Sequence, residues 1–354
     1  MINIQELLQK DPYQKYKNTR KDFLKLIKDL TLHHTKNSIE YKKIFNFFKY
    51  NLSKINSVDD IPYIPINLFK SKDLISIKKK DINKTLLSSG TSNTALSKIY
   101  LDKENAYNQV KVLKKIMESL LGTKRLPMLV IDQKPDNNSR EKFNARKAAI
   151  YGFSIFGKEQ TFFLNEKGKI NYKEVNNFLK KYKNNKFLIF GFTSFIYENL
   201  ILKLSTEFLE GDFKNGVLLH GGGWKKMNDI KISNKLFKFK LQNKLNLKEI
   251  YNYYGLVEQT GSIFIECKKC GSFLSSNFSD VIVRDKYFNK VKDGQKGLVQ
   301  LISLLPTSYP GHSILTEDIG EIVPRHKIKC KLNVKHFLIH GRLENSEVRG
   351  CSDV

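Results

Sequence analysis

The sequence predicts an α/β protein, and three observations carry this prediction. Short apolar runs at 127–132, 187–191 and 216–219 alternate with stretches of helical periodicity, a pattern typical of sheets covered by helices. Two later runs, at 297–302 and 320–323, are typical of antiparallel strands. An apolar fraction of 40% in 354 residues is enough for sizeable cores.

Residues 1–85 are expected to form helices joined by polar connections and packed on the body. Apolar side chains recur there at helical spacing, the first group behind a cap at Asn18 or Thr19. We expect them all in the core: Phe23, Leu24, Ile27, Leu30, Ile44, Phe47 and Phe48. The segment 61–69 holds two prolines and should form an extended strap.

The middle of the chain predicts alternating strands and helices. A strand at 99–101 is followed by a helix that Asp102 caps and Gly122 ends. Further strands are expected at 127–132, 187–191, 216–219 and 247–254, with helices at 145–150 and 175–182. The buried stripe of the first helix is expected to be Ala106, Val110, Leu113, Met117 and Leu120.

A run of hydroxyl side chains around one glycine lies at 88–98 and ends in a lysine. Small residues let backbone amides turn toward an anion, hydroxyls add donors, and an ammonium group neutralises phosphate charge. The alternative is a polar surface turn, because the stretch lacks the full Walker spacing. The predicted phosphate-holding residues are Ser88, Ser89, Gly90, Thr91, Ser92 and Lys98.

Two further strands end in residues suited to a nucleotide. Three successive glycines allow a ligand to lie against bare backbone, or they form a flexible turn. The next strand ends in an aromatic ring to stack on a base, a glycine for close approach and a carboxylate for a divalent cation. These residues are Gly221, Gly222 and Gly223, then Tyr254, Gly255 and Glu258. Asp318, at 315–318, either accepts from ribose hydroxyls or sits in a turn.

The charge of +27 invites a nucleic-acid interpretation, which the composition disfavours. The chain has 54 lysines and only eight arginines, whereas arginine is the better residue for bidentate phosphate and base recognition. The N-terminus has no secretory apolar region, and no run approaches membrane-spanning length. We expect a soluble cytoplasmic protein that has no transmembrane segment. We also expect that the protein does not bind nucleic acid.

The cysteines leave two interpretations open. Cys267 and Cys270 have half of a zinc-ribbon spacing, and Cys330 is a candidate third ligand. The fourth ligand would be His326 or His336. Free thiols packed near the surface are the alternative.

Taken together and in order, these motifs resemble the adenylate-forming superfamily of acyl-CoA synthetases and their relatives. Its pattern comprises a hydroxyl-rich loop ending in Lys, a Gly-rich adenine loop, Tyr-Gly-x-x-Glu, a ribose-binding Asp and Gly-Arg-x-Asp at a hinge. The counterparts here are residues 88–98, 221–223, 254–258, 318 and 341–344. Within the superfamily the chain is most similar to LuxE-type acyl-protein synthetases, from about residue 64 to the end.

The resemblance implies a fold and a domain plan. The fold would be the N-terminal domain of an adenylate-forming enzyme, with packed mixed sheets and helices and with the C-terminal lid and its lysine largely absent. Residues 1–85 would be a helical segment on the body, 86–340 the α/β core, and 341–354 a hinge-like tail carrying Cys351. Two positions depart from the superfamily pattern: Val257 replaces a Thr or Ser, and Glu344 replaces the hinge Asp.

The resemblance also implies a two-step reaction. ATP and a carboxylic acid, in this family a fatty acid, give an acyl-adenylate and pyrophosphate. The acyl group then passes to an enzyme cysteine and on to an acyl reductase or carrier protein. The implied roles are phosphate binding by Lys98, Mg²⁺ binding by Glu258, adenine stacking by Tyr254, ribose contact by Asp318, ribose or phosphate contact by Arg342, and acyl acceptance by Cys351.

Two other functions stay open at this point. The first is an acid:CoA or acid:carrier-protein ligase that forms no covalent acyl-enzyme. The second is a basic binding protein with a degenerate adenylation fold. For Cys351 itself, an unreactive tail thiol is the alternative, because no adjacent base is visible in the sequence.

Overall fold

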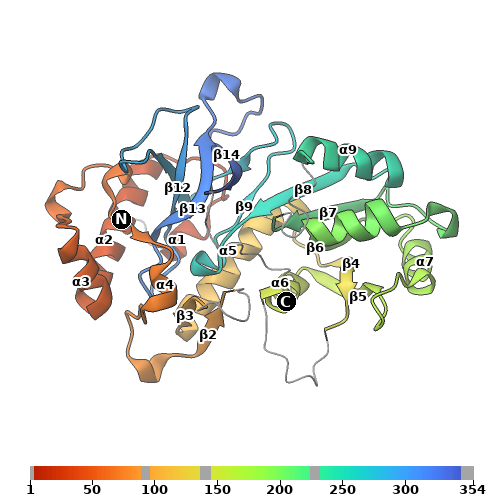
Figure 1. Cartoon of the computed structure of the whole chain (residues 1–354), viewed down its shortest axis with the longest axis horizontal. Helices are drawn as coiled ribbons and strands as arrows, with labels where there is room; N and C mark the ends of the chain where they lie inside the picture. The colour runs from red at the N-terminus through yellow and green to blue at the C-terminus, as the bar shows by residue number, and fades with distance from the viewer. Residues whose placement is uncertain (1–3, 89–95, 136–144, 224–231, 344–354) are drawn as a thin grey trace. The chain divides into compact units, whose positions relative to one another are not determined.

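The computed structural model of the chain describes residues 4–88, 96–135, 145–223 and 232–343 (Figure 1). These residues form two compact units. The first unit comprises the described residues of 4–120 and 254–343, and the second those of 121–253. The division expected from the sequence, with borders at 85 and 340, remains a prediction.

The second unit is built on a parallel sheet in the order β5-β4-β6-β7-β8. Helices connect its strands, as parallel neighbours require. The strands are β4 (Leu126–Gln133), β5 (Gly157–Leu164), β6 (Phe187–Phe192), β7 (Gly216–Gly221) and β8 (Glu249–Tyr254). The connections carry α6 (Ala145–Ser154), α7 (Tyr172–Lys181), α8 (Thr193–Ile196), η4 (Tyr197–Lys203), η5 (Thr206–Phe208) and α9 (Asn234–Leu245).

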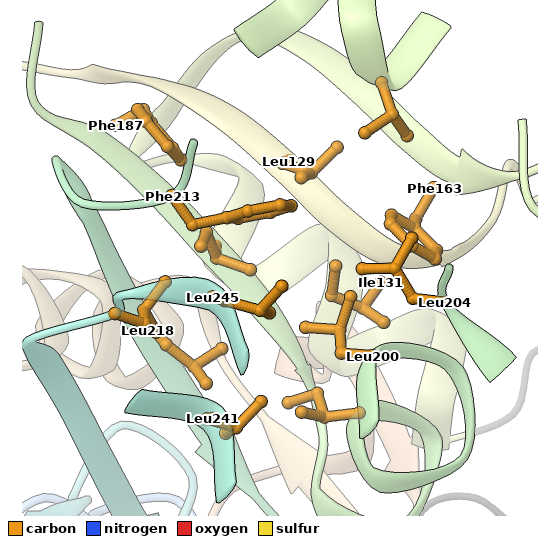
Figure 2. Packing of buried hydrophobic residues seen from close by; sticks show 14 of the residues in the cluster. Leu129, Ile131, Phe163, Phe187, Leu200, Leu204, Phe213, Leu218, Leu241 and Leu245 are labelled. Atoms are coloured by element: carbon orange, nitrogen blue, oxygen red, sulfur yellow. The ribbon is translucent and has the colours of Figure 1, made fainter. Parts of the chain in front are cut away.

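Alternate side chains of this sheet pack on opposite faces. On one face, Leu129, Ile131 and Leu218 meet buried residues of α7, η4 and α9 (Figure 2). On the other face, Phe190 stacks on Phe153 of α6 at 4.6 Å between ring centroids. Both faces are therefore apolar, which explains why the central strands read as continuous apolar runs in the sequence.

The first unit contains a mixed sheet in the order β10-β14-β13-β12-β11, with β1 parallel on β13. The strands are β1 (Ile64–Pro65), β10 (Phe273–Leu274), β11 (Ser279–Arg284), β12 (Lys296–Ser303), β13 (Ser313–Ile322) and β14 (His336–Arg342). β9 (Phe264–Ile265) and the hairpin of β2 (Lys84–Leu87) and β3 (Lys98–Leu101) also belong to this unit.

Helices of the first unit come mainly from the N-terminal part of the chain. They are α1 (Ile4–Leu7), α2 (Thr19–Asn37), α3 (Ile39–Phe47), α4 (Leu68–Ser71) and α5 (Lys103–Leu121). Short 3-10 turns are η1 (Leu52–Lys54), η2 (Val58–Asp60), η3 (Lys79–Asp81), η7 (Val257–Gln259) and η8 (Arg325–Lys327). α2 is tied to the sheet side by the buried Thr31 Oγ1, 3.1 Å from His312 Nε2.

Two expectations about burial are wrong, the first for two phenylalanines and the second for part of a helix face. Phe47 and Phe48, expected in the core, are exposed, and Phe45 is the buried phenylalanine of that helix. The buried stripe of α5 is correct at Met117 but wrong at Val110, which is half exposed, and it omits the buried Val112 and Ile116. Of the two alternatives for Asp318, the turn is excluded, because β13 runs unbroken through this position.

Buried polar side chains explain why the buried face of α5 differs from the expected stripe. Asn105 of α5 donates to the Leu305 carbonyl and accepts from Ser308 Oγ at 3.0 Å. A hydrophobicity pattern cannot assign such a residue to the buried face, although its hydrogen bonds make burial favourable. Within the described residues, none of the helices combines the length and hydropathy needed to cross a bilayer.

Candidate functional site

The β2–β3 hairpin holds the base of the predicted phosphate loop. Ser88 and Ser97 close it reciprocally: the Ser88 amide donates to the Ser97 carbonyl at 3.0 Å, and the Ser97 amide donates to Ser88 Oγ at 2.8 Å. Lys98 lies opposite Leu87 in the register, with an exposed side chain. The Ser88 hydroxyl thus fixes the loop base, and its contact with phosphate stays a prediction. Four predicted loop residues, Ser89, Gly90, Thr91 and Ser92, lie outside the described residues.

Three predicted site residues of the first unit are in direct contact. The Tyr254 hydroxyl donates to Asp318 Oδ2 at 2.6 Å, and Arg342 Nε donates to Asp318 Oδ1 at 3.2 Å. Strand register creates this contact, because Asp318 of β13 pairs directly with Arg342 of β14. Residues that are distant in sequence thus form one network, which we call the carboxylate network (Tyr254, Asp318 and Arg342).

Burial and charge set the protonation of Tyr254. Loss of water around the Tyr254 hydroxyl, followed by the nearby charge of Asp318, raises the pKa of Tyr254 well above its ordinary value. The tyrosine therefore stays protonated and donates to the carboxylate. Its ring packs among Phe264, Phe273 and Phe337, with centroids 5.8–6.1 Å away.

The turn η7 places Glu258 in a buried position. The Tyr309 hydroxyl donates to the Glu258 carbonyl at 2.9 Å, and Gln259 Nε2 donates to the carbonyls of Leu301 and Gly311. The preceding Gly255 leaves little space, since a Cβ there would lie 3.1 Å from the Ile263 side chain. The backbone around the carboxylate is therefore held from several sides.

Thr260 does not simply replace the hydroxyl missing at Val257. Its Oγ1 donates to the Val257 carbonyl at 2.7 Å. The hydroxyl hydrogen is thereby used within the turn, and only the oxygen lone pairs are left to a ligand.

The predicted glycine loop follows β7 in the second unit. A Cβ on Gly221 would lie 2.5 Å from the Tyr253 ring, so only glycine fits at the end of this strand. Gly222 has a φ of +77°, and both Gly222 and Gly223 are exposed. The loop thus presents bare backbone at the carboxyl end of a parallel strand, the usual place for ligands in such sheets.

Two polar pairs near the same sheet edge were missed by sequence reasoning. His220 Nδ1 lies 2.9 Å from Thr193 Oγ1, and burial lowers the pKa of His220 to about 3, so the ring is neutral. Arg146 of α6 binds Asp132 at the end of β4, and its guanidinium stacks 4.1 Å from the Phe195 ring centroid. Arg146 is one of only eight arginines in a lysine-rich chain, which is the one sequence signal that marks it.

The zinc candidates also meet in the first unit. The sulfurs of Cys267, Cys270 and Cys330 all lie within 4.8 Å of one another. His336 Nε2 lies 3.5 Å from Cys330 Sγ, whereas His326 is exposed on η8. The remaining predicted site residue, Cys351, lies outside the described residues, as does the hinge position Glu344.

Known proteins share this sequence pattern and fold. The sequence matches the family described as acyl-protein synthetase, LuxE, over residues 2–354. It is 23% identical over 325 residues to the long-chain-fatty-acid–luciferin-component ligase of Aliivibrio fischeri, covering 84% of this chain and 78% of that protein.

Solved structures of 2-hydroxyisobutyryl-CoA ligase have a similar fold. The complex with 2-HIB-AMP in the postadenylation state has a TM-score of 0.72 at 12% identity, covering 94% of this chain and 70% of that one. An open conformation with 2-HIB-AMP and CoA has a TM-score of 0.70 at 13% identity, covering 92% and 70%. The α/β fold is therefore that of adenylate-forming ligases, and the match along almost the whole sequence shows that the chain belongs to the LuxE acyl-protein synthetase family.

Proposed function

We propose that this protein activates a carboxylic acid, in keeping with its family a long-chain fatty acid, with ATP and then carries the acyl group on Cys351. The family match over residues 2–354 carries the proposal. The carboxylate network supports it, because a buried carboxylate between a tyrosine and an arginine is suited to accept hydrogen bonds from ribose hydroxyls. ATP is supplied inside the cell, so a cytoplasmic location belongs to the proposal.

The residues divide the first step between them. Lys98, exposed at the base of its loop, neutralises charge on the departing phosphates. Asp318 fixes the ribose, and Arg342 holds that carboxylate in place while remaining near ribose or phosphate oxygens. Tyr254 is the residue assigned to stack on the base, and the bare backbone of Gly222 and Gly223 is suited to close approach of the nucleotide.

The carboxylate of Glu258 is a suitable ligand for Mg²⁺. Glu258 supplies a carboxylate, the oxygen ligand that Mg²⁺ prefers, from a turn whose backbone is fixed by Tyr309 and Gln259. When bound, the ion would neutralise negative charge on the phosphates. The fixed turn means that little conformational entropy is lost when the carboxylate is engaged.

Acid-dependent exchange of pyrophosphate into ATP tests the first step. Fatty acids of increasing chain length should support exchange, with the fastest rate among the long ones. Lys98→Ala should slow exchange by about 100- to 1,000-fold, the size of effect seen when one donor to transition-state charge is removed. The matched control is Lys84→Ala, an exposed lysine at the far end of the same hairpin, which should change the rate by less than about twofold.

The outcome can contradict the proposal directly. Tight ATP binding without exchange for any acid would identify a degenerate binding protein. Equal loss of exchange in Lys98→Ala and Lys84→Ala would remove the assigned role of Lys98.

Transfer to the tail tests the second step. Incubation with labelled fatty acid, ATP and Mg²⁺ should leave a thioester label on the wild-type chain that disappears in Cys351→Ser, while pyrophosphate exchange continues. Label that leaves the adenylate only when CoA or a carrier protein is added would instead identify an acid:CoA or acid:carrier ligase. An acyl reductase or carrier protein added to the labelled chain should then receive the acyl group, which identifies the partner class.

A further inference from the structure

Three cysteines and one histidine of the first unit converge outside the proposed adenylation site. Cys267 and Cys270 flank a tight turn between β9 and β10, closed by bonds from the Gly271 amide to the Cys267 carbonyl and from the Cys267 amide to the Ser272 carbonyl, both 2.8 Å. Gly271 has a φ of +66°, which glycine adopts without strain. Cys330 joins the pair from a distant segment of the chain.

The spacing of the donor atoms matches a tetrahedral metal. Zinc bonds of about 2.3 Å to sulfur and about 2.0–2.1 Å to nitrogen place neighbouring ligand atoms about 3.5–3.8 Å apart in a tetrahedron. The three sulfurs lie within 4.8 Å of one another, and His336 Nε2 lies 3.5 Å from Cys330 Sγ. The imidazole stands at the Cys330 side of the group, so the set is completed when it moves toward the other two sulfurs.

The histidine is already oriented for this role. His336 is fully buried, and its Nδ1 lies 2.8 Å from the hydroxyl of the buried Ser272. A hydrogen bond from Nδ1 fixes the ring and leaves the Nε2 lone pair directed toward the cysteines, the usual arrangement of a metal-bound histidine. His326, the other candidate for the fourth ligand, lies exposed on η8.

The charges around the cysteines suit a bound metal. Three thiolates and Zn²⁺ carry a net charge of −1, and lysines flank each of these cysteines: Lys268 and Lys269 between the first two, and Lys329 and Lys331 on either side of Cys330. Binding displaces the three thiol protons to solvent as the three sulfur–zinc bonds form.

From these contacts we propose a structural zinc site formed by Cys267, Cys270, Cys330 and His336, with Ser272 positioning the histidine. Four protein ligands leave no open position for a water molecule, so the ion does not take part in the reaction. Its effect is mechanical: it joins the β9–β10 turn and the segment at Cys330 to the first residue of β14. Arg342 lies at the other end of this seven-residue strand, about 20 Å from His336, and there it contacts Asp318.

Metal analysis of the full-length protein tests the proposal. Protein purified without a metal-affinity step from zinc-supplemented culture should contain about one zinc ion per chain. His336→Ala should lower zinc affinity at least about tenfold, and Ser272→Ala by a smaller factor. His326→Ala and Cys351→Ser are the matched controls, which should keep the zinc content of the wild type.

A second measurement covers variants that fail to fold. Wild-type protein titrated with a thiol reagent should release zinc to a chromophoric chelator in step with modification of the cysteines, and Co²⁺ should give thiolate charge-transfer absorption. Protein without zinc that also fails to bind Co²⁺ under reducing conditions would overturn the site. Unchanged zinc affinity in His336→Ala would overturn the fourth ligand.

Discussion

A buried carboxylate is stable only when donors replace the water it has lost, and Asp318 has two such donors. Tyr254 and Arg342 supply them from separate elements. The two hydrogen bonds hold the carboxylate in one orientation, so a ligand hydroxyl meets an acceptor that does not have to reorganise. The carboxylate network therefore contributes both to stability and to the proposed ribose contact.

Tyr254→Phe tests that double role. The ring remains, but the carboxylate loses one donor, so the free energy of unfolding should fall by about 1–3 kcal/mol and ATP affinity should weaken. Urea denaturation and nucleotide titration measure the two effects. Tyr287→Phe, at an exposed tyrosine, should leave both within error. An unchanged unfolding free energy in Tyr254→Phe would show that the hydrogen bond to Asp318 contributes nothing.

Sequence order predicted the members of this network but not their contact. The sequence left a ribose contact and a turn open for Asp318, and only the register of β13 on β14 brings Arg342 beside it. Register depends on pairing between distant segments, which local patterns do not encode. Thr193 was missed for a different reason: a lone threonine has no distinctive pattern, and its role appears only through its contact with His220.

At the scale of elements, the last residue of β7 has no space for a side chain, because the neighbouring strand β8 fills it. Gly221 pairs with Tyr253 of β8, whose ring fills the volume that a side chain would need. The glycine is therefore required by sheet packing as well as by any ligand. The three glycines were predicted as one motif, but packing does not require glycine at each of them. Among the described residues, no atom lies within 4 Å of a Cβ placed on Gly223.

Two alanine substitutions in the second unit should have opposite signs. Gly221→Ala forces the Tyr253 ring to move and should lower the free energy of unfolding by about 1–3 kcal/mol. Gly152→Ala lies on the exposed side of α6 with open space around it, and should raise the free energy of unfolding by about 0.5–1 kcal/mol. Thermal unfolding of both variants checks this. A stable Gly221→Ala would mean that the sheet edge adapts freely.

The same scale shows where periodicity fails. The helix α5 was predicted with correct ends, but its buried face was assigned from apolar residues alone. Asn105 and Gln109 are buried on that face. The backbone of Gln109 packs closely against Gly261, because a Cβ placed on Gly261 would lie 2.7 Å from the Gln109 carbonyl oxygen. Helix existence follows from local sequence, whereas the buried face follows from the partners.

Over the whole molecule, buried histidines couple stability to pH. Burial lowers the pKa of His34, and it lowers the pKa values of His220 and His312 to about 3. Unfolded histidines bind protons near pH 6.5, so below that pH the unfolded state holds more protons than the folded one. The stabilisation is complete above about pH 6.5 and decreases as the pH falls toward the folded-state pKa values.

Urea denaturation at pH 7.5 and pH 5.5 measures this coupling while carboxylates stay ionised. The free energy of unfolding should fall at the lower pH by about 1 kcal/mol per pH unit for each buried histidine, once the pH is below 6.5. His220→Gln should reduce the slope, and His326→Gln, at an exposed histidine, should not. A stability that is flat between the two pH values would contradict neutral burial of these rings.

The way the two units divide the sequence has a consequence for synthesis on the ribosome. All five strands of the parallel sheet lie between residues 126 and 254, so the second unit can pack while the chain is still growing. The first unit must wait, because β1 finds its partner β13 only after some 250 further residues have emerged, with Ile64 opposite Ile314. The N-terminal helices are thus translated first and completed last. Until β13 is available, the apolar faces of these helices stay exposed to solvent. Mutations that delay folding of the C-terminal strands should therefore reduce the yield of folded protein, because the N-terminal helices remain unpacked for longer.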